Sequence, residues 1–193
     1  DGSKTLYVNA DGAQDIQEAV LFAHGCGVKR TVIVGGYDAW RVADLLLDKK
    51  VDVILRRVHG LPLRDEDDVD LPFRLPALLK SKGIRFCLGY SGDMERMGCR
   101  NLAFMAGTAA AYGLSEEEAL RAITFDAARV LGIDQRYGSL SIGKSATIFV
   151  SAGNALDMRT NNVTHAFIDG RHLDLDDHQK KLYRQYERRR AEP

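Results

Sequence analysis

Thr31-Val32-Ile33-Val34-Gly35-Gly36 is an apolar run that ends in two glycines, and a helical pattern follows it over residues 39–47. A strand that is apolar at every position is typical of a parallel sheet covered on both faces. The segment therefore predicts a buried strand, a tight turn and a helix, the repeating unit of a parallel α/β fold. The Gly35-Gly36 pair could also hold a phosphate at the start of the helix, but a single glycine pair is a weak signal and favours the turn.

The same unit recurs on both sides of this segment. Short β-rich runs predict three more strands, each followed by a helical pattern: strands at residues 5–8, 51–55 and 84–88, and helices at residues 13–22, 75–83 and 100–112. Residues 56–72 are expected to form a polar connection. Four successive units argue for a parallel sheet with right-handed crossovers. A closed barrel and an open doubly wound sheet both satisfy this order, and hydrophobic periodicity does not separate them.

The pattern changes after the fourth unit. Ser115 and Glu118 form a capping box that begins a helix ending at Gly132. One apolar stripe is expected along that helix, made of Ala119, Leu120, Ile123, Ala127 and Val130. Residues 138–150 predict a turn and a strand, residues 164–168 predict another strand, and Asp169-Gly170 predicts a hairpin turn. Residues 176–190 predict a terminal helix whose charges face solvent, with binding to an acidic partner as the alternative.

Composition excludes several classes of function. The 193 residues include 27 basic and 27 acidic side chains, and 45% are hydrophobic, as in a soluble globular protein with no net field to attract nucleic acid. No apolar run reaches the roughly 18 residues needed to cross a bilayer. We expect neither a nucleic-acid nor a membrane partner, and a cytoplasmic and a periplasmic location both fit. Cys26, Cys87 and Cys99 lack metal or disulfide spacing and are expected to be small buried side chains.

Three linked stretches carry a family resemblance: residues 113–124 (GLSEEEALRAIT), 127–132 (AARVLG) and 138–148 (GSLSIGKSATI). Their order resembles the C-terminal segment of the amidohydrolase superfamily, closest to the imidazolonepropionase-like branch of these metal-dependent hydrolases. The resemblance implies an α/β fold: the C-terminal half of a TIM (β/α)8 barrel, with four βα units, plus part of a small β-sandwich and a C-terminal helix. It assigns residues 1–135 to the half-barrel with strands five to eight, residues 136–175 to the sandwich remnant and residues 176–193 to the terminal helix.

The resemblance also implies where a metal would bind. Relatives hydrolyse carbon–nitrogen or related bonds with one or two divalent metals, such as zinc, held by a His-x-His pair on strand one, often Lys or Glu on strand four, His on strands five and six, and Asp on strand eight. Strands one to four are expected to lie outside this chain. Asn9 stands where the strand-five imidazole belongs, strand six ends in Gly35-Gly36, and Ser91 stands at the position of the strand-eight acid. We therefore expect no metal or other cofactor in this chain.

The remaining candidate site residues follow strands seven and eight. Asp93 is a candidate catalytic carboxylate that could replace the missing acid if its loop bulges. Arg57 and His59 would face the barrel mouth and are candidates for substrate binding, with a solvated loop as the alternative. The other histidines lack ligand spacing and are expected at the surface: His24, His165, His172 and His178.

Two functions follow from the altered ligand positions. The chain is expected to be a fragment or a degenerate member of a family that hydrolyses carbon–nitrogen (non-peptide) bonds, inactive on its own. The alternative is a metal-free half-barrel that binds a small molecule or a partner. An active enzyme would need Asp93, His59 and a partner chain to rebuild a site. Because half a barrel has two unpaired edges and an open inner face, we expect a homo-oligomer, with a barrel-like dimer as the simplest form, or association with a missing N-terminal half.

Overall fold

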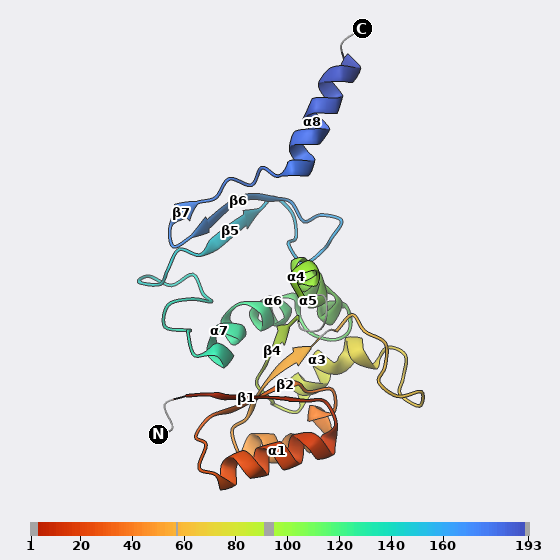
Figure 1. Ribbon diagram of the computed structural model, residues 1–193, viewed down its shortest axis with the longest axis vertical. Coiled ribbons are helices and arrows are strands. Elements are labelled where there is room, and N and C mark those ends of the chain that lie inside the picture. Colours follow the sequence, from red (N-terminus) through yellow and green to blue (C-terminus); the bar gives the residue numbers. More distant parts are fainter. Residues whose placement is uncertain (1–3, 57, 91–94, 192–193) are drawn as a thin grey trace. The chain divides into compact units, whose positions relative to one another are not determined.

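The computed structural model describes residues 4–56, 58–90 and 95–191 (Figure 1). The chain divides into two compact units. The first comprises Asp1–Lys144 with Leu156–Met158, and the second comprises Ser145–Ala155 with Arg159–Pro193. These units are clusters of contacts, so the expected boundaries after residues 135 and 175 stay predictions. No helix in the described part of the chain combines the length and apolar character needed to cross a membrane.

The first unit is built on a parallel sheet of four strands: β1 (Leu6–Ala10), β2 (Thr31–Gly35), β3 (Asp52–Arg56) and β4 (Phe86–Gly89). Each strand pairs with the next one along the chain, in the order β1-β2-β3-β4. A doubly wound sheet reverses its strand order at a switch point, whereas strands of a barrel follow one another in sequence. The order therefore identifies a partial TIM barrel, as the resemblance implied.

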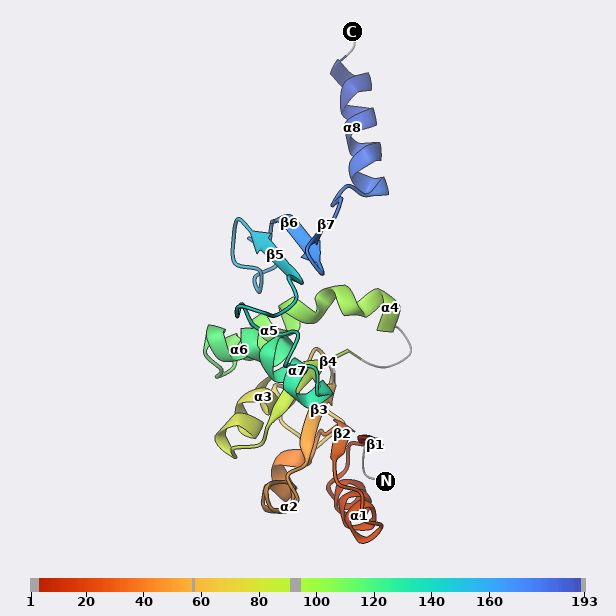
Figure 2. The same ribbon diagram turned by 90° about the vertical axis from the view of Figure 1, so that its left-hand side faces the viewer.

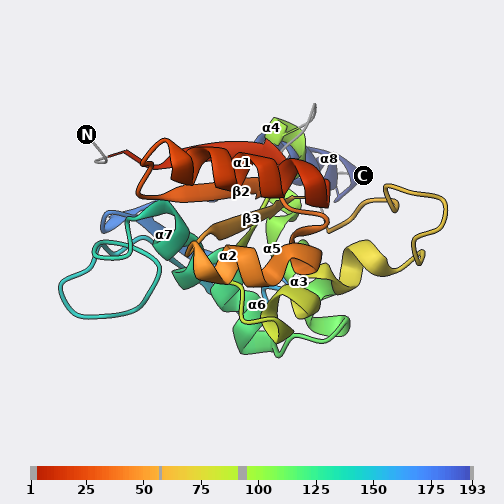
Figure 3. The same ribbon diagram turned by 90° about the horizontal axis from the view of Figure 1, so that it is seen from below.

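Helices follow each strand, and those after the first three strands cover one face of the sheet. The first three strands lead into α1 (Ala13–Gly25), the 3-10 helix η1 (Ala39–Val42) with α2 (Ala43–Asp48), and α3 (Leu71–Ser81). Helix α1 buries Ile16, Val20 and Ala23 at helical spacing. Figure 3, a view from below, shows α1, α2 and α3 lying along the sheet. After β4 come α4 (Glu95–Gly98), the 3-10 helix η2 (Cys99–Asn101), α5 (Leu102–Ala111), α6 (Glu116–Ile123) and α7 (Phe125–Leu131).

Two expected helix boundaries were wrong. Helix α3 begins at Leu71 and not at residue 75, because Pro72 lies in the first turn, where a missing N–H costs no helical hydrogen bond. The helix expected to run from the capping box to Gly132 breaks at Thr124, whose φ of −126° and ψ of −90° are not helical. The break separates α6 from α7, and Leu120 is 42% exposed instead of joining one continuous apolar stripe.

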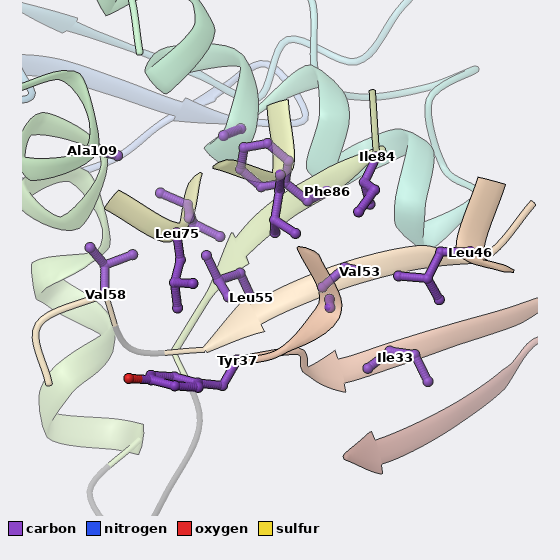
Figure 4. Packing of buried hydrophobic residues seen from close by; sticks show 14 of the residues in the cluster. Ile33, Tyr37, Leu46, Val53, Leu55, Val58, Leu75, Ile84, Phe86 and Ala109 are labelled. Atoms are coloured by element: carbon purple, nitrogen blue, oxygen red, sulfur yellow. The ribbon is translucent and has the colours of Figure 1, made fainter. Parts of the chain in front are cut away.

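The core lies between the sheet and its covering helices. Alternate strand side chains point to opposite faces, and Ile33, Val53, Leu55 and Phe86 lie on the helix-covered face with Leu75 of α3 (Figure 4). On the inner face, Val32 and Cys87 pack against Val130 of α7. Figure 2 shows α1 and α2 on one side of the strands and α7 on the other.

The cysteine expectation holds for one residue of three. Cys87 is buried on the inner face, and burial raises the pKa of its thiol to about 12. Cys26 and Cys99 are exposed, so their expected burial was wrong. Both residues lie at helix ends, beyond the apolar positions that face the core.

The second unit contains an antiparallel sheet of three strands: β5 (Ile148–Ser151), β6 (Val163–Ile168) and β7 (Arg171–His172). Asp169 and Gly170 join β6 to β7 with φ values of 49° and 78°, so both residues of the turn are left-handed, as in a type I′ hairpin. The hairpin prediction is confirmed. The charged side chains of α8 (His178–Ala191) are exposed from residue 178 to residue 190, as expected of a solvated helix.

Candidate functional site

The carboxyl ends of β1, β2 and β3 meet at one edge of the sheet, where TIM barrels carry their binding residues. Asp11 follows β1, Tyr37 and Asp38 follow the Gly35-Gly36 turn after β2, and Arg56 ends β3. Because parallel strands place these ends side by side, residues distant in sequence become neighbours. This edge is the candidate site, and we call it the barrel mouth.

An ion pair lies on the inner side of the barrel mouth. Asn9 pairs in register with Val34, and Val34 with Ile54, so alternation places Asn9 and Arg56 on the inner face of the sheet, and Asp11 follows directly after β1. The Arg56 guanidinium donates a hydrogen bond from Nη2 to Oδ2 of Asp11. A positive side chain therefore neutralises the first carboxylate after β1.

Glycine at position 35 is required by this ion pair. Its φ is +117°, and a Cβ there would lie 2.5 Å from Oδ1 of Asp11 and 2.8 Å from the carbonyl oxygen of Ala10. The amide of Gly36 donates to the same carbonyl oxygen at 2.8 Å. The Gly35-Gly36 segment is therefore a tight turn whose Gly36 amide is already used within the protein, which argues against the phosphate interpretation.

A cavity of about 380 Å³ opens at the barrel mouth. Its polar lining includes Asp11, Tyr37, Arg56 and His59, and its apolar lining includes Leu63 and Leu75. Pockets for small molecules commonly combine an apolar wall with a few polar groups in this way, at volumes of about 300–1,000 Å³. The cavity can therefore accept a small organic molecule and orient it by hydrogen bonds.

His59 contributes an imidazole to this cavity. Its Nε2 lies 2.6 Å from the Oγ1 of Thr108 on α5, which holds the ring in place although the residue is exposed. Partial removal of the ring from water lowers the pKa of His59 below its usual value. A neutral imidazole with one nitrogen free is suited to accept a proton from a ligand.

Two buried carboxylates attach the β3–α3 connection to the turn after β2. The side chains of Asp38 and Asp67 are 4% and 5% exposed. Arg64 hydrogen-bonds to both, at 3.2 Å from Nη1 to Oδ2 of Asp67, and Arg41 donates from Nε to Oδ1 of Asp38 at 3.1 Å. Asp38 also accepts from the Ala13 amide at the start of α1, at 3.3 Å. The network holds one wall of the cavity.

Tyr37 links this network to the cavity. Its hydroxyl donates to Oδ2 of Asp67 at 2.9 Å and accepts from the Leu63 amide at 3.3 Å. Burial is the main cause that raises the pKa of Tyr37, and the Asp67 carboxylate adds to it. The hydroxyl is therefore a proton donor at neutral pH and fixes the loop that carries Leu63.

The structure brings only part of the predicted site together. His59 lines the cavity, and Asn9 is exposed on the inner face near the end of β1. Arg57, Ser91 and Asp93 lie outside the described residues. The four remaining histidines are exposed, as expected.

Sequence reasoning missed Asp11, Tyr37 and Arg56. Each lies at the carboxyl end of a strand or shortly after it, and His59 was identified because it also follows a strand. That placement was a usable signal, because side chains at the carboxyl ends of parallel strands converge.

The described side chains at the mouth do not fit a divalent metal. The Asn9 amide is a poor ligand for zinc, and the Arg56 cation beside Asp11 would repel a second positive charge. In the part of the chain that the structure describes, no group of three or more His, Cys, Asp or Glu side chains is placed to hold a metal ion.

Comparisons with known proteins agree with this architecture. The model of the amidohydrolase family matches residues 5–173. An amidohydrolase from Thermotoga maritima MSB8 is similar over 87% of this chain and 43% of its own, with a TM-score of 0.76 and 28% identity. No curated protein matches the chain. The match to the imidazolonepropionase-like branch stays a prediction.

Two further solved structures, both under 25% identical, show the fold alone. A zinc-bound adenosine deaminase from Xanthomonas campestris matches over 96% of this chain and 50% of its own, with a TM-score of 0.60 and 18% identity. A Xaa-Pro dipeptidase with methionine in its active site matches over 87% of this chain and 44% of its own, with a TM-score of 0.64 and 17% identity. The chain thus spans half or less of these structures.

Proposed function

Because the chain belongs to the amidohydrolase family, we propose that it is the C-terminal half of an amidohydrolase barrel that does not by itself hydrolyse carbon–nitrogen bonds through a metal. The observation that carries the proposal is the ion pair between Arg56 and Asp11 on the inner side of the barrel mouth. Metal-dependent hydrolysis needs imidazoles and unpaired carboxylates that converge on a cation. At this mouth a guanidinium already satisfies the carboxylate.

Metal analysis and turnover test this proposal together. We expect purified chain dialysed against zinc to show no zinc-dependent hydrolysis of an amide and dipeptide panel, and Asp11→Asn to leave that result unchanged. Zinc-dependent turnover that a chelator abolishes and that Asp11→Asn removes would contradict the proposal. Asp68→Asn is the matched control, since Asp68 is an exposed carboxylate away from the cavity.

The cavity supports a second candidate function, metal-free binding of a small molecule. Its polar groups are held by the protein before any ligand arrives: Tyr37 by Asp67, and His59 by Thr108. Pre-organised groups lower the entropic cost of binding. A ligand with an apolar body and one group that exchanges hydrogen bonds with His59 or Arg56 fits this lining.

A thermal-shift screen with small amides and carboxylates tests this candidate. We expect a hit to stabilise the chain and the effect to disappear in Leu63→Trp, which fills the cavity. Leu140→Trp adds the same ring at an exposed position that does not line the cavity and should preserve the effect. A hit that stabilises both variants equally would place the ligand elsewhere.

We also propose that the chain associates, either with a second copy or with an N-terminal half. The sheet ends at β1 and β4, and on β1 Leu6 and Tyr7 are 38% and 41% exposed. An exposed edge strand with apolar side chains favours pairing with another strand. Light scattering should show a species larger than one chain, and Tyr7→Lys should reduce its size while Tyr186→Lys on α8 should not. A stable monomer at micromolar concentration would contradict this proposal.

A further inference from the structure

Two exposed histidines lie on one face of the small antiparallel sheet of the second unit. Their ring centres are 5.9 Å apart, with a tilt of 52° between the rings. Phe167 of β6 stands directly opposite His172 of β7, and His165 precedes Phe167 by two residues. Side chains two positions apart on a strand share a face, so both imidazoles project from the same side of the sheet. Figure 1 shows β6 and β7 as neighbouring strands.

The hydrogen bonds around Thr164 set the tautomer of the neutral His165 ring. The Thr164 hydroxyl donates its one proton to the carbonyl oxygen of Val150 at 3.2 Å. Its oxygen lies 3.2 Å from Nδ1 of His165 and must therefore accept there. Nδ1 of His165 carries the hydrogen, and Nε2 keeps a free lone pair. Histidines that bind metals are commonly held in this way, with the second ring nitrogen donating to an oxygen.

The ring of His172 is also held in place. It packs against Phe167 with ring centres 5.1 Å apart and a tilt of 58°. The hairpin turn at Asp169 and Gly170 holds β6 and β7 in register. A chelating pair needs this kind of pre-organisation, because freezing two free side chains would offset much of the binding energy.

We propose that His165 and His172 form a two-imidazole site for a divalent transition metal ion of the Ni²⁺, Cu²⁺ and Zn²⁺ group. Imidazole nitrogens suit these ions, and an ion about 2.1 Å from a nitrogen of each ring holds the ring centres about 5–6 Å apart. The separation of 5.9 Å meets this requirement. Nε2 of His165 is one ligand, and a ring nitrogen of His172 is the other.

The remaining coordination positions belong to water. No third His, Cys, Asp or Glu side chain joins the pair among the described residues, so the site is open and its affinity is that of two imidazoles. It lies on β6 and β7 and is independent of the barrel mouth. Its failure and the failure of the proposed function are therefore separate outcomes.

Titration of the full chain with Ni²⁺ alone, followed by calorimetry and by the NMR signals of the histidine rings, tests the proposal. We expect one equivalent to bind and the signals of His165 and His172 to broaden first. His165→Gln and His172→Gln should each weaken binding by about tenfold or more, because one imidazole in place of two loses the chelate. Circular dichroism of each variant checks that the sheet persists.

Three further variants sharpen the result. Thr164→Val removes the acceptor for Nδ1 of His165 and should weaken binding by a smaller factor, whereas His24→Gln and His178→Gln should leave it unchanged. The proposal is overturned if His165→Gln and His172→Gln bind Ni²⁺ as wild type does, or if His24→Gln or His178→Gln weakens binding as much as they do.

Discussion

Nε2 of His59 and Oγ1 of Thr108 lie 2.6 Å apart, although 49 positions separate the two residues in sequence. The Thr108 hydroxyl donates its proton to the carbonyl oxygen of Phe104 at 3.1 Å. The hydroxyl therefore accepts from His59, so Nε2 carries the hydrogen and Nδ1 keeps its lone pair. This contact joins the connection after β3 to α5 and fixes the tautomer of the ring, while partial burial favours its neutral form by lowering the pKa of His59.

The lowered pKa of His59 predicts a dependence of stability on pH. The folded chain binds the proton of His59 more weakly than the unfolded chain, in which a histidine titrates at about 6.5. The contribution of His59 to the free energy of unfolding is therefore fully present above that pH and is lost as pH falls through the folded pKa. NMR titration should give His59 a midpoint below that of an unfolded peptide, and His59→Gln should remove this part of the pH dependence of urea unfolding. A midpoint at or above the peptide value would contradict the assignment.

Replacing Gly35 should damage the barrel mouth. Gly35→Ala places a Cβ 2.5 Å from Oδ1 of Asp11 at a φ of +117°, so we expect a loss of about 2 kcal/mol or more in the free energy of unfolding. Gly143→Ala meets a left-handed φ of +90° with no atom within 4 Å, and should cost only about 1 kcal/mol. Urea unfolding of both variants separates the effect of the clash with Asp11 from the effect of the left-handed φ. Equal losses in the free energy of unfolding would show that the clash has no effect.

Asp38 should contribute more to stability than an exposed carboxylate. Asp38→Asn removes the charge that Arg41 and Arg64 share on a side chain that is 4% exposed. Because both arginines reach solvent, we expect the free energy of unfolding to fall by about 2 kcal/mol, which is less than the loss for a fully buried ion pair. Asp68→Asn, at a side chain that is 71% exposed, should cost about 0.5 kcal/mol or less. Similar losses in urea unfolding would contradict this difference.

Glu118 should titrate far below an ordinary glutamate. The Ser115 amide, then Lys80 and the Ser115 hydroxyl, lower the pKa of Glu118 to about 2. Since the folded pKa is depressed, its contribution is present above the ordinary value of 4.5 and is lost as pH falls through about 2. NMR titration of the carboxyl group measures this. Lys80→Met should raise the midpoint, because Nζ of Lys80 lies 2.9 Å from the carboxylate, and Lys82→Met is the control.

Local signals predicted most of the first unit. The strands were expected within two residues of where they begin, because apolar runs followed by Gly or polar residues report burial directly. The capping box at Ser115 is present with both hydrogen bonds, since it depends on residues three apart. The break at Thr124 was missed because no Gly or Pro marks it. The break lets α7 pack Val130 against the inner face of the sheet, and such tertiary packing leaves no local signal in the sequence.

Hydrophobic periodicity did not choose between a barrel and a doubly wound sheet; the family resemblance implied the barrel, and the strand pairing in the structure confirms it. Both folds are built from the same βα units, and they differ in which strands pair. Partner residues lie 25 positions apart in the pairing of β1 with β2 and 20 positions apart in the pairing of β2 with β3. Hydrophobic periodicity within each segment does not carry that information.

By itself, the sequence determined the kinds of element, their order along the chain and the altered residues at family ligand positions such as Asn9, because each depends on neighbouring residues or on linear motifs. Only the tertiary structure decided that Arg56 meets Asp11 and that His59 meets Thr108. Those side-chain contacts depend on strand register and on how the helices cross the sheet. Both bring side chains together regardless of their separation in sequence.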